Sequence, residues 1–403
     1  MLRVPVVAMA AVLGLMAVAM RPADAQVLSY LHSYTNGPDG NSPFGGPAMD
    51  SAGNIYAVTL YGGSGGGGTA VRLTQRNGHW TTQLLHSFAG GNDGKAPYAN
   101  VTIGPDGSVY GTTTMGGGGC QPDGCGTVFK LTPPARVCPQ TQCPWTETIL
   151  YRFGDSDAHL ATPYGWVTFD SAGNLYGTTA QGGAGCVPQG CGTVYKLTRS
   201  GDTWTPSVIY EFTGHDDGSF PIAGPTIDQA GNLYGTTYGG SVYELVRSGT
   251  SWTENTLYTF QYGADGGYPE AGVVFDSAGN LYGATTIVNS DDIGGVFYKL
   301  THSGSGWTFS ILYTYTLSGI FGNVAVDAAG NIYASAQDGG SQRVGSVIKL
   351  TNSGGVYTLT DLHDFGGLGW PQGDVLLDAA GNLYGTTMGE GQDGYGSVWE
   401  IQF

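Results

Sequence analysis

Charged residues are scarce in this 403-residue sequence, at 11% of the chain against about 25% in an average soluble domain. Basic residues are the scarcer sign, because 14 Lys and Arg accompany 31 Asp and Glu and the net charge is −17. A surface this acidic repels nucleic acid and anionic lipid. We therefore expect neither as a partner.

Recognisable catalytic motifs are missing. The sequence has no nucleophile elbow, phosphate-binding P-loop, dinucleotide fingerprint or zinc-protease helix. Gly-x-Gly strings do not indicate a nucleotide-binding loop here, because a chain with 71 glycines contains them by chance. The sequence consequently identifies no catalytic residue and no certain cofactor.

Long apolar runs are absent except at the N-terminus. The run from Val4 to Met20 follows Arg3 and precedes the small-residue site Ala23–Ala25, which is the order of a secretory signal peptide. We expect removal of residues 1–25, which leaves 26–403 as one secreted or periplasmic domain without a membrane span. The alternative is an uncleaved anchor, but a run of about 17 residues is at the short limit for spanning.

Cysteines number only six, and they form three pairs of identical spacing. In an exported protein, an even number with local pairing indicates disulfides. Zinc binding is the alternative, but C-x4-C is not a usual zinc spacing. The predicted disulfides are Cys120–Cys125, Cys138–Cys143 and Cys186–Cys191.

One short core is present seven times, and it decides the fold prediction. Its commonest form is D-x-A-G-N-L-Y-G, and successive copies are 48 to 66 residues apart. Propeller blades of about 40–50 residues with inserted loops have this period. The seven copies begin at Asp50, Gly104, Asp170, Asp228, Asp276, Asp327 and Asp378.

Each repeat contains four short β patterns, here called strands a to d. Strand a ends at the core Asp, and D-x-x-G is a tight turn in which that Asp is expected to accept backbone hydrogen bonds. Strand b is GNLYGTT, strand c is of the type GTVYKLT, and strand d ends in L-Y-x-F or a variant. Runs of four to eight apolar and aromatic residues between turns are typical of strands, and no stretch has a helical period.

The two chain ends complete one blade. Val27 to Tyr34 matches strand d, whereas Gly396 to Phe403 matches strand c. The last repeat therefore lacks strand d, and the N-terminus can supply it, which removes the free edge of a ring. We predict an all-β, seven-bladed β-propeller of four-stranded blades, closed by the N-terminal strand. A solenoid would need terminal caps instead.

Two further positions recur in strand d. Trp80, Trp145, Trp204, Trp252 and Trp307, with Tyr357, begin the strand, and we expect them to pack between blades. Near the end of the strand His and Tyr share a position, which is typical of a half-buried outer strand. Its members are His32, His86, Tyr151, Tyr210, Tyr258, Tyr313 and His363.

Acidic residues gather in the variable d–a and b–c loops, which we expect on one face of the ring. Carboxylates and Gly carbonyls suit hard cations and hydroxyl-rich glycans, and Ca²⁺ is the candidate cation at Asp93, Asp217 and Asp265. The alternative is that these are solvated turns, because Gly and Asp dominate turns. The candidates for this ligand face are Asp93, Asp157, Asp217, Asp265, Asp292, Asp338, Glu390 and Asp393.

The repeat resembles the GloVer-type tandem repeat of secreted bacterial proteins. Asp170 to Thr179, Gly192 to Thr198 and Trp204 to Phe212 carry the resemblance best. It implies export, tandem blades and varied means of surface attachment. It names no activity.

Three functional hypotheses remain. The first is a non-catalytic extracellular or periplasmic binding or scaffold propeller, monomeric, for a glycan or a cell-surface protein. The second is a glycan-active hydrolase or lyase that uses loop carboxylates. The third is a structural cell-surface repeat protein. Fold alone does not choose between them.

Overall fold

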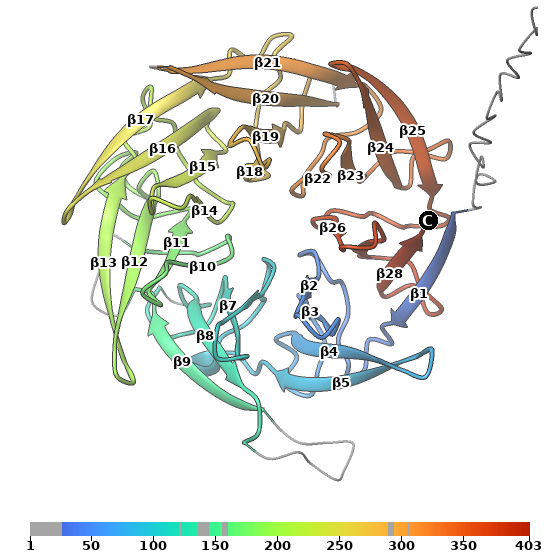
Figure 1. Ribbon diagram of the computed structural model, residues 1–403. Coiled ribbons are helices and arrows are strands. Elements are labelled where there is room, and N and C mark those ends of the chain that lie inside the picture. Colours follow the sequence, from blue (N-terminus) through green and yellow to red (C-terminus); the bar gives the residue numbers. More distant parts are fainter. Residues whose placement is uncertain (1–25, 121, 136–144, 155–159, 289–293, 305) are drawn as a thin grey trace, which may run out of the picture.

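The short apolar and aromatic segments form strands, and each repeat closes into a four-stranded antiparallel sheet. The computed structural model describes residues 26–120, 122–135, 145–154, 160–288, 294–304 and 306–403. Within these ranges seven sheets surround a central axis as the blades of a seven-bladed β-propeller, and the helix content is one 3₁₀ turn, Gly91–Asp93 (Figure 1). The predicted fold class is therefore confirmed.

The two inner strands of each blade are short. Strand a has two residues and lines the axis, whereas strand b is buried throughout because it packs between neighbouring blades. The a strands are β2 (Ala48–Met49), β6 (Thr102–Ile103), β10 (Thr168–Phe169), β14 (Thr226–Ile227), β18 (Val274–Phe275), β22 (Ala325–Val326) and β26 (Leu376–Leu377). The b strands are β3 (Ile55–Thr59), β7 (Val109–Thr113), β11 (Leu175–Thr179), β15 (Leu233–Thr237), β19 (Leu281–Ala284), β23 (Ile332–Ala336) and β27 (Leu383–Thr387).

The two outer strands are longer, and their pairing has a bulge at the same place in every blade. The bulge directly precedes the shared His or Tyr position of strand d. The c strands are β4 (Thr69–Arg76), β8 (Thr127–Thr132), β12 (Thr193–Ser200), β16 (Ser241–Ser248), β20 (Gly295–Ser303), β24 (Ser346–Ser353) and β28 (Ser397–Gln402). The d strands are β5 (His79–Ser87), β9 (Thr146–Arg152), β13 (Thr203–Glu211), β17 (Ser251–Thr259), β21 (Gly306–Tyr315), β25 (Val356–Asp364) and β1 (Val27–Ser33).

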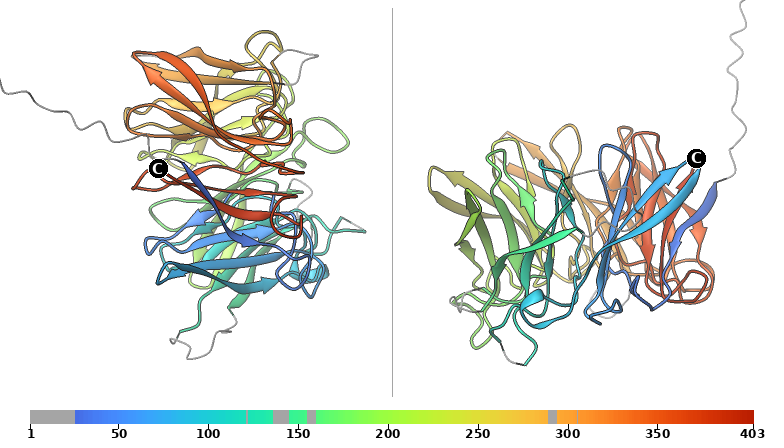
Figure 2. Two further views of the ribbon diagram at one scale, coloured as in Figure 1. Left: turned by 90° about the vertical axis from the view of Figure 1, so that its right-hand side faces the viewer. Right: turned by 90° about the horizontal axis from the view of Figure 1, so that it is seen from below.

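The N-terminal strand closes the ring, as predicted. β1 pairs antiparallel with β28, from Val27 opposite Gln402 to Ser33 opposite Ser397. Figures 1 and 2 show β1 beside the last blade. Tyr34 is fully buried, and its backbone N–H donates to the Gly396 carbonyl at 2.9 Å. The first and last segments of the chain thus share one sheet.

The core Asp fixes the a–b turn. In the third blade the Asp170 carboxylate accepts hydrogen bonds from the backbone N–H groups of Ala172 and Asn174 at 3.0 and 2.9 Å. It also accepts one from the Tyr176 hydroxyl of strand b at 3.1 Å. These contacts confirm the local role expected for this Asp, and they extend it to the neighbouring strand.

The second blade keeps this turn with a different residue. Gly104 occupies the Asp position there, and Asp106, two residues later, accepts from the Ser108 N–H and the Tyr110 hydroxyl at 3.1 Å each. Lys130 of β8 lies 2.8 Å from the same carboxylate. The bond between a turn carboxylate and the tyrosine of strand b is therefore retained although the Asp has moved.

Aromatic residues join neighbouring blades. Trp145 packs edge-on against Tyr56 of the preceding blade, with ring centroids 6.2 Å apart, and Trp252 packs in the same way against Tyr176 at 6.0 Å. Buried clusters combine strands b and c of successive blades. The tryptophans that begin strand d therefore pack between blades, as expected.

Two of the three predicted disulfides are present, both in b–c loops. Cys120 is bonded to Cys125 and Cys186 to Cys191. The pair Cys138–Cys143 and the N-terminal residues 1–25 lie outside the described residues. Among the described residues, no helix is long and apolar enough to cross a membrane.

Candidate functional site

The d–a and b–c loops meet on one face of the ring. Isolated bridges join Asn41 to Tyr61 in the first blade and Lys95 to Met115 in the second. Each bridge links the middle of a d–a loop to the start of a b–c loop. Because the chain enters every strand a from this face, the residues just before strand a lie around the axis.

Seven equivalent residues form a ring that we call the axial mouth. Each is the fourth residue before its strand a, and in six blades it directly follows a proline. They line a shallow depression with a volume of about 60 Å³. The axial mouth consists of Phe44, Tyr98, Tyr164, Ile222, Glu270, Phe321 and Gln372.

Aromatic rings make up one side of the axial mouth. Phe44 and Tyr98 lie with ring centroids 3.9 Å apart, and Tyr98 contacts Tyr164 edge-on at 5.1 Å. All three side chains are half-buried, so part of each ring remains accessible. Blades one to three thus supply a continuous aromatic wall.

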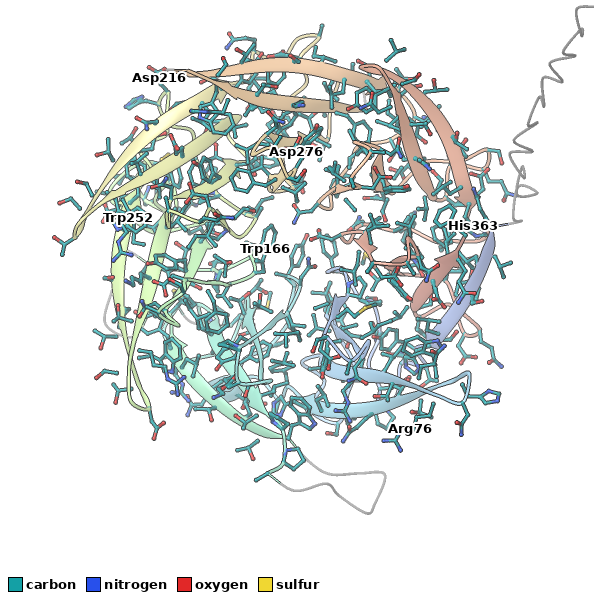
Figure 3. All side chains as sticks on the ribbon, in the orientation of Figure 1. Arg76, Trp166, Asp216, Trp252, Asp276 and His363 are labelled. Carbon is teal, nitrogen blue, oxygen red and sulfur yellow. A yellow bond between two sulfur atoms is a disulfide. The ribbon has the colours of Figure 1, made fainter. Side chains whose placement is uncertain are left out.

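The residues two positions further along form a second ring, the inner ring. Trp166 extends from the third blade across the axis, against Gly224 and Gly272 of the next two blades (Figure 3). A Cβ on Gly224 would lie 2.7 Å from the indole, and one on Gly272 would lie 2.8 Å from it. The inner ring consists of Gly46, Asn100, Trp166, Gly224, Gly272, Asn323 and Asp374.

Asp374 holds the other half of the inner ring together. Its carboxylate accepts hydrogen bonds from the Asn323 N–H at 2.7 Å, from the Asn323 side-chain amide at 2.8 Å, and from the Asn100 side-chain amide. It lies against Gly46, the position between these blades that has no side chain. Burial raises the pKa of Asp374, and the three donors act against that shift.

A cavity of about 670 Å³ lies along the axis beyond the inner ring. Apolar residues of the a strands, such as Met49, Ile103 and Phe275, line it. Trp166 and Asp374 border both this cavity and the axial mouth. The inner ring therefore separates a shallow mouth from a deeper, largely apolar channel.

Glu270 is the one carboxylate of the axial mouth. Burial raises its pKa from 4.5 to about 7, and no other cause contributes. Its charge in turn contributes to the raised pKa of Tyr98, after burial of that phenol. The mouth therefore combines aromatic surface with a carboxylate that is protonated in part at neutral pH.

The predicted loop carboxylates Asp93, Asp217 and Asp265 each bind within their own loop. Asp217 accepts from the Thr213 N–H at 2.8 Å and from the Tyr210 hydroxyl at 3.0 Å. Asp265 repeats this pattern with the Gln261 N–H and the Tyr258 hydroxyl, both at 2.8 Å. The shared His or Tyr position of strand d thus holds the loop Asp seven residues later.

The remaining predicted residues are dispersed. The Asp338 N–H donates to the Ser318 hydroxyl at 2.9 Å, and Glu390 accepts from the Gly366 N–H at 3.1 Å. Asp393 is exposed in the last b–c loop. Asp157 and Asp292 lie outside the described residues.

One group of metal-binding type occurs in the described part of the chain. Ligand atoms of His86, Asp93 and Glu147 lie within 4.8 Å of one another. Asp93 is thus brought together with a His and a Glu, whereas Asp217 and Asp265 belong to no such group of described residues. The structure does not bring the three predicted Ca²⁺ residues together at one point.

The axial mouth and inner ring were not predicted. The recurring residues define the fold, whereas a position that can carry a specific function changes its residue type from blade to blade. The position after the d–a proline does so, and Glu270 and Gln372 interrupt its aromatic series. That variation at a fixed point of the repeat was the available signal.

The sequence comparison identifies a repeat family. The model of the Gloeobacter/Verrucomicrobia repeat matches residues 16–238 and, overlapping them, residues 136–323. Together these matches span more than half of the chain. No curated protein matches the sequence.

Solved structures share the fold at low identity. A fungal alcohol oxidase of the AA5 family, in complex with copper, has a TM-score of 0.57 and 14% identity over 93% of this chain and 75% of its own. The PQQ-bound aldose sugar dehydrogenase from Streptomyces coelicolor has a TM-score of 0.50 and 12% identity, and the match covers 95% of this chain and 99% of the dehydrogenase. The extracellular domain of a protein assigned as a one component system from B. thetaiotaomicron has a TM-score of 0.53 and 12% identity over 93% of this chain. The chain spans 40% of that last protein's length, and similarity at these identities shows the fold alone.

Proposed function

The chain belongs to the Gloeobacter/Verrucomicrobia repeat family, and from its axial mouth we propose that it is an exported, non-catalytic binding propeller for a neutral glycan. The observation that carries the proposal is the aromatic wall of Phe44, Tyr98 and Tyr164 beside the polar side chains of Glu270 and Gln372. Binding sites typically combine an apolar surface with a few polar groups that orient the ligand. The aromatic rings would stack on the C–H face of a sugar, and the two polar side chains would bind its hydroxyls.

Charge and shape limit the kind of glycan that the axial mouth could bind. The net charge of −17 and the carboxylate of Glu270 disfavour acidic polysaccharides. A depression of about 60 Å³ is too small to enclose an oligosaccharide, so we propose that one sugar ring enters it. The rest of the glycan would then lie across the d–a and b–c loops.

Export is supported by the disulfides. Cys120–Cys125 and Cys186–Cys191 persist in an oxidising compartment and are rare in the cytosol. The N-terminal pattern of basic residue, apolar run and small-residue site agrees with this. We therefore propose a secreted or periplasmic location, with a glycan or glycosylated surface component as the partner.

The test is a binding screen followed by substitution. A panel of neutral cello-, malto-, manno- and xylo-oligosaccharides, with oligogalacturonides as the acidic contrast, identifies a ligand whose affinity is then measured by calorimetry. Replacing Tyr98 and Tyr164 together by Ala should weaken binding by at least about tenfold, because two stacking surfaces are lost. Tyr395→Ala is the matched control, because Tyr395 is an exposed tyrosine in a b–c loop of the same face.

Two results would contradict the proposal. One is a panel in which only the acidic sugars bind. The other is a neutral ligand whose affinity is unchanged in the double variant, since that ligand binds elsewhere on the protein. Thermal denaturation of each variant without sugar shows that the fold is retained.

Glycan cleavage is the second candidate, and Glu270 favours it. A general acid needs a pKa near the working pH, and burial places the pKa of this side chain at about 7. Asp374, the other carboxylate of the two rings, is already held by Asn100 and Asn323. Reducing-end release from the ligand, abolished by Glu270→Gln, would support cleavage, whereas an intact ligand after prolonged incubation supports binding alone.

A further inference from the structure

The outer edge of the ring holds a contact between blades that differs from one repeat to the next. The His or Tyr of strand d contacts the loop Asp seven residues later, and a residue of the next blade's strand d lies beside them. In one set the members are His32, Asp39 and Thr82, with the Thr82 hydroxyl 3.1 Å from His32 Nδ1. The fold thus builds one three-residue arrangement several times with different side chains.

Between the first two blades this arrangement combines an imidazole with two carboxylates. His86 is on β5, Asp93 ends the 3₁₀ turn, and Glu147 is on β9, the neighbouring outer strand (Figure 1). His86 Nε2 lies 3.0 Å from an Asp93 carboxylate oxygen and 3.4 Å from Glu147 Oε1. Their side chains are between 15% and 22% exposed, so the group is shielded but reachable from solvent.

The spacing suits a tetrahedral metal ion. Bonds of about 2.0–2.1 Å to nitrogen and oxygen ligands place neighbouring ligand atoms about 3.3 Å apart. The two separations from His86 Nε2, 3.0 and 3.4 Å, lie on either side of that value, and all three ligand atoms lie within 4.8 Å of one another. His86, Asp93 and Glu147 could therefore bind one ion with little movement.

The ligand atoms also have lone pairs to give. Glu147 Oε1 is buried without a hydrogen-bond partner among the described residues. One Asp93 oxygen accepts from the Ala89 N–H at 2.6 Å, and the other is hydrogen-bonded with His86 Nε2 at 3.0 Å. In the equivalent Asp217, by contrast, donors from Tyr210, Thr213 and His215 occupy both oxygens.

Two carboxylates beside one imidazole leave an excess of negative charge. The Arg152 guanidinium donates to the Asn92 carbonyl at 3.2 Å. A divalent cation bound among the three side chains would offset their excess negative charge.

We propose that His86, Asp93 and Glu147 bind one first-row divalent transition metal ion, Zn²⁺ by preference, which clamps the first two blades together. His86 supplies Nε2, the two carboxylates supply one oxygen each, and water completes the coordination. An imidazole ligand favours Zn²⁺ over Ca²⁺, which prefers six to eight oxygen ligands.

The chain supplies its own matched variants. Tyr210, Asp217 and Glu254 form an equivalent set in which Tyr replaces His, and Thr82 is the residue beside His32 where Glu147 lies beside His86. His86→Tyr and Glu147→Thr therefore introduce residues that the fold already accepts at these positions. His32→Tyr is the control, because it changes the same strand position in a set without the Glu.

The experiment is calorimetric titration of the purified, tag-free protein with ZnCl₂ and with CaCl₂, with melting temperatures measured in parallel. We expect one Zn²⁺ per chain, a higher melting temperature with Zn²⁺, and little response to Ca²⁺. His86→Tyr and Glu147→Thr should each weaken Zn²⁺ binding by at least about 100-fold and remove the melting shift, whereas His32→Tyr should leave both unchanged.

Three results would overturn the proposal. The first is the absence of stoichiometric Zn²⁺ binding by the parent protein. The second is Zn²⁺ affinity that persists in both His86→Tyr and Glu147→Thr, because the ion is then bound by other residues. The third is a Ca²⁺ response as strong as the Zn²⁺ response. Equal melting temperatures of all variants in EDTA show that a lost response does not reflect unfolding.

Discussion

The indole of Trp166 lies against the Cα atom of Gly224, where a Cβ would be only 2.7 Å from the ring. Trp166 precedes strand a of the third blade and Gly224 that of the fourth, so the contact joins neighbouring blades at the axis. A missing side chain in one repeat thus makes room for the largest side chain of another. The repeats are therefore nearly identical in their turns but complementary at the axis.

Gly224→Ala should consequently disturb the inner ring. The added methyl would lie 2.3 Å from the Trp166 carbonyl oxygen and 2.7 Å from the indole, so both must move. Overpacking of this kind lowers the free energy of unfolding by about 1–3 kcal/mol. Gly306→Ala is the control, because a Cβ there meets no atom within 4 Å. Urea denaturation of both variants checks the prediction, and equal stability of the two would show that the indole moves aside freely.

Deletion of Val27–Tyr34 should open the ring. It removes β1 from the last blade together with the buried side chains of Leu31 and Tyr34, and it leaves the edge of β28 unpaired. Loss of two large core side chains should lower the free energy of unfolding by at least about 4 kcal/mol. Val27→Ala, at a position that is 53% exposed, should have little effect. A truncated protein that melts like the parent would refute the closure.

Glu270 should make stability depend on pH. The group ionises near pH 4.5 in the unfolded chain and near 7 in the folded one, so the folded state binds its proton more tightly between these values. The contribution of Glu270 to stability therefore falls as pH rises from about 4.5 to about 7 and is constant above that range. Glu270→Gln should remove this term, which makes the variant more stable than the parent by about 3 kcal/mol at about pH 8 and equally stable at about pH 4. Parallel pH profiles of the two proteins in urea denaturation would contradict the assignment.

The cysteines should be bonded only within their pairs. Two pairs are bonded in b–c loops, and we predict the same for Cys138 and Cys143, which have the same spacing. Non-reducing peptide mapping of the exported protein is the measurement. Free thiols, or a bond between different pairs, would show that the prediction is wrong.

The propeller could be predicted because its determinants are local and repeated. The turn carboxylate contacts the strand-b tyrosine of its own repeat, and the strand-d tryptophan contacts the tyrosine of the neighbouring repeat. The sequence pattern behind these contacts recurs along the chain, so each copy supports the same fold prediction. Even the departure at Gly104 keeps the bond from Tyr110, through Asp106. Ring closure followed from the unpaired a–b–c pattern at the C-terminus.

The axial site could not be predicted in the same way. Glu270, Trp166 and Asp374 come from different blades, and they meet only because seven strands converge on one axis. No pattern within one repeat predicts the hydrogen bond between Asn100 and Asp374, which forms because Gly46, between them in the ring, has no side chain. The loop aspartates, by contrast, recur from blade to blade because they have a local role: Asp217 and Asp265 each accept a backbone hydrogen bond within their own loop.

The most direct test of the central claim is hydroxyl-radical footprinting with the tightest-binding neutral oligosaccharide from the panel. Footprinting reports the accessibility of each aromatic side chain. The comparison is between residues of one type, which have the same intrinsic reactivity and differ only in position: Tyr98, Tyr164 and Tyr395. We predict that bound sugar protects Tyr98 and Tyr164 from oxidation and leaves Tyr395 unchanged. Unchanged oxidation of Tyr98 and Tyr164 at saturating sugar would contradict binding at the axial mouth.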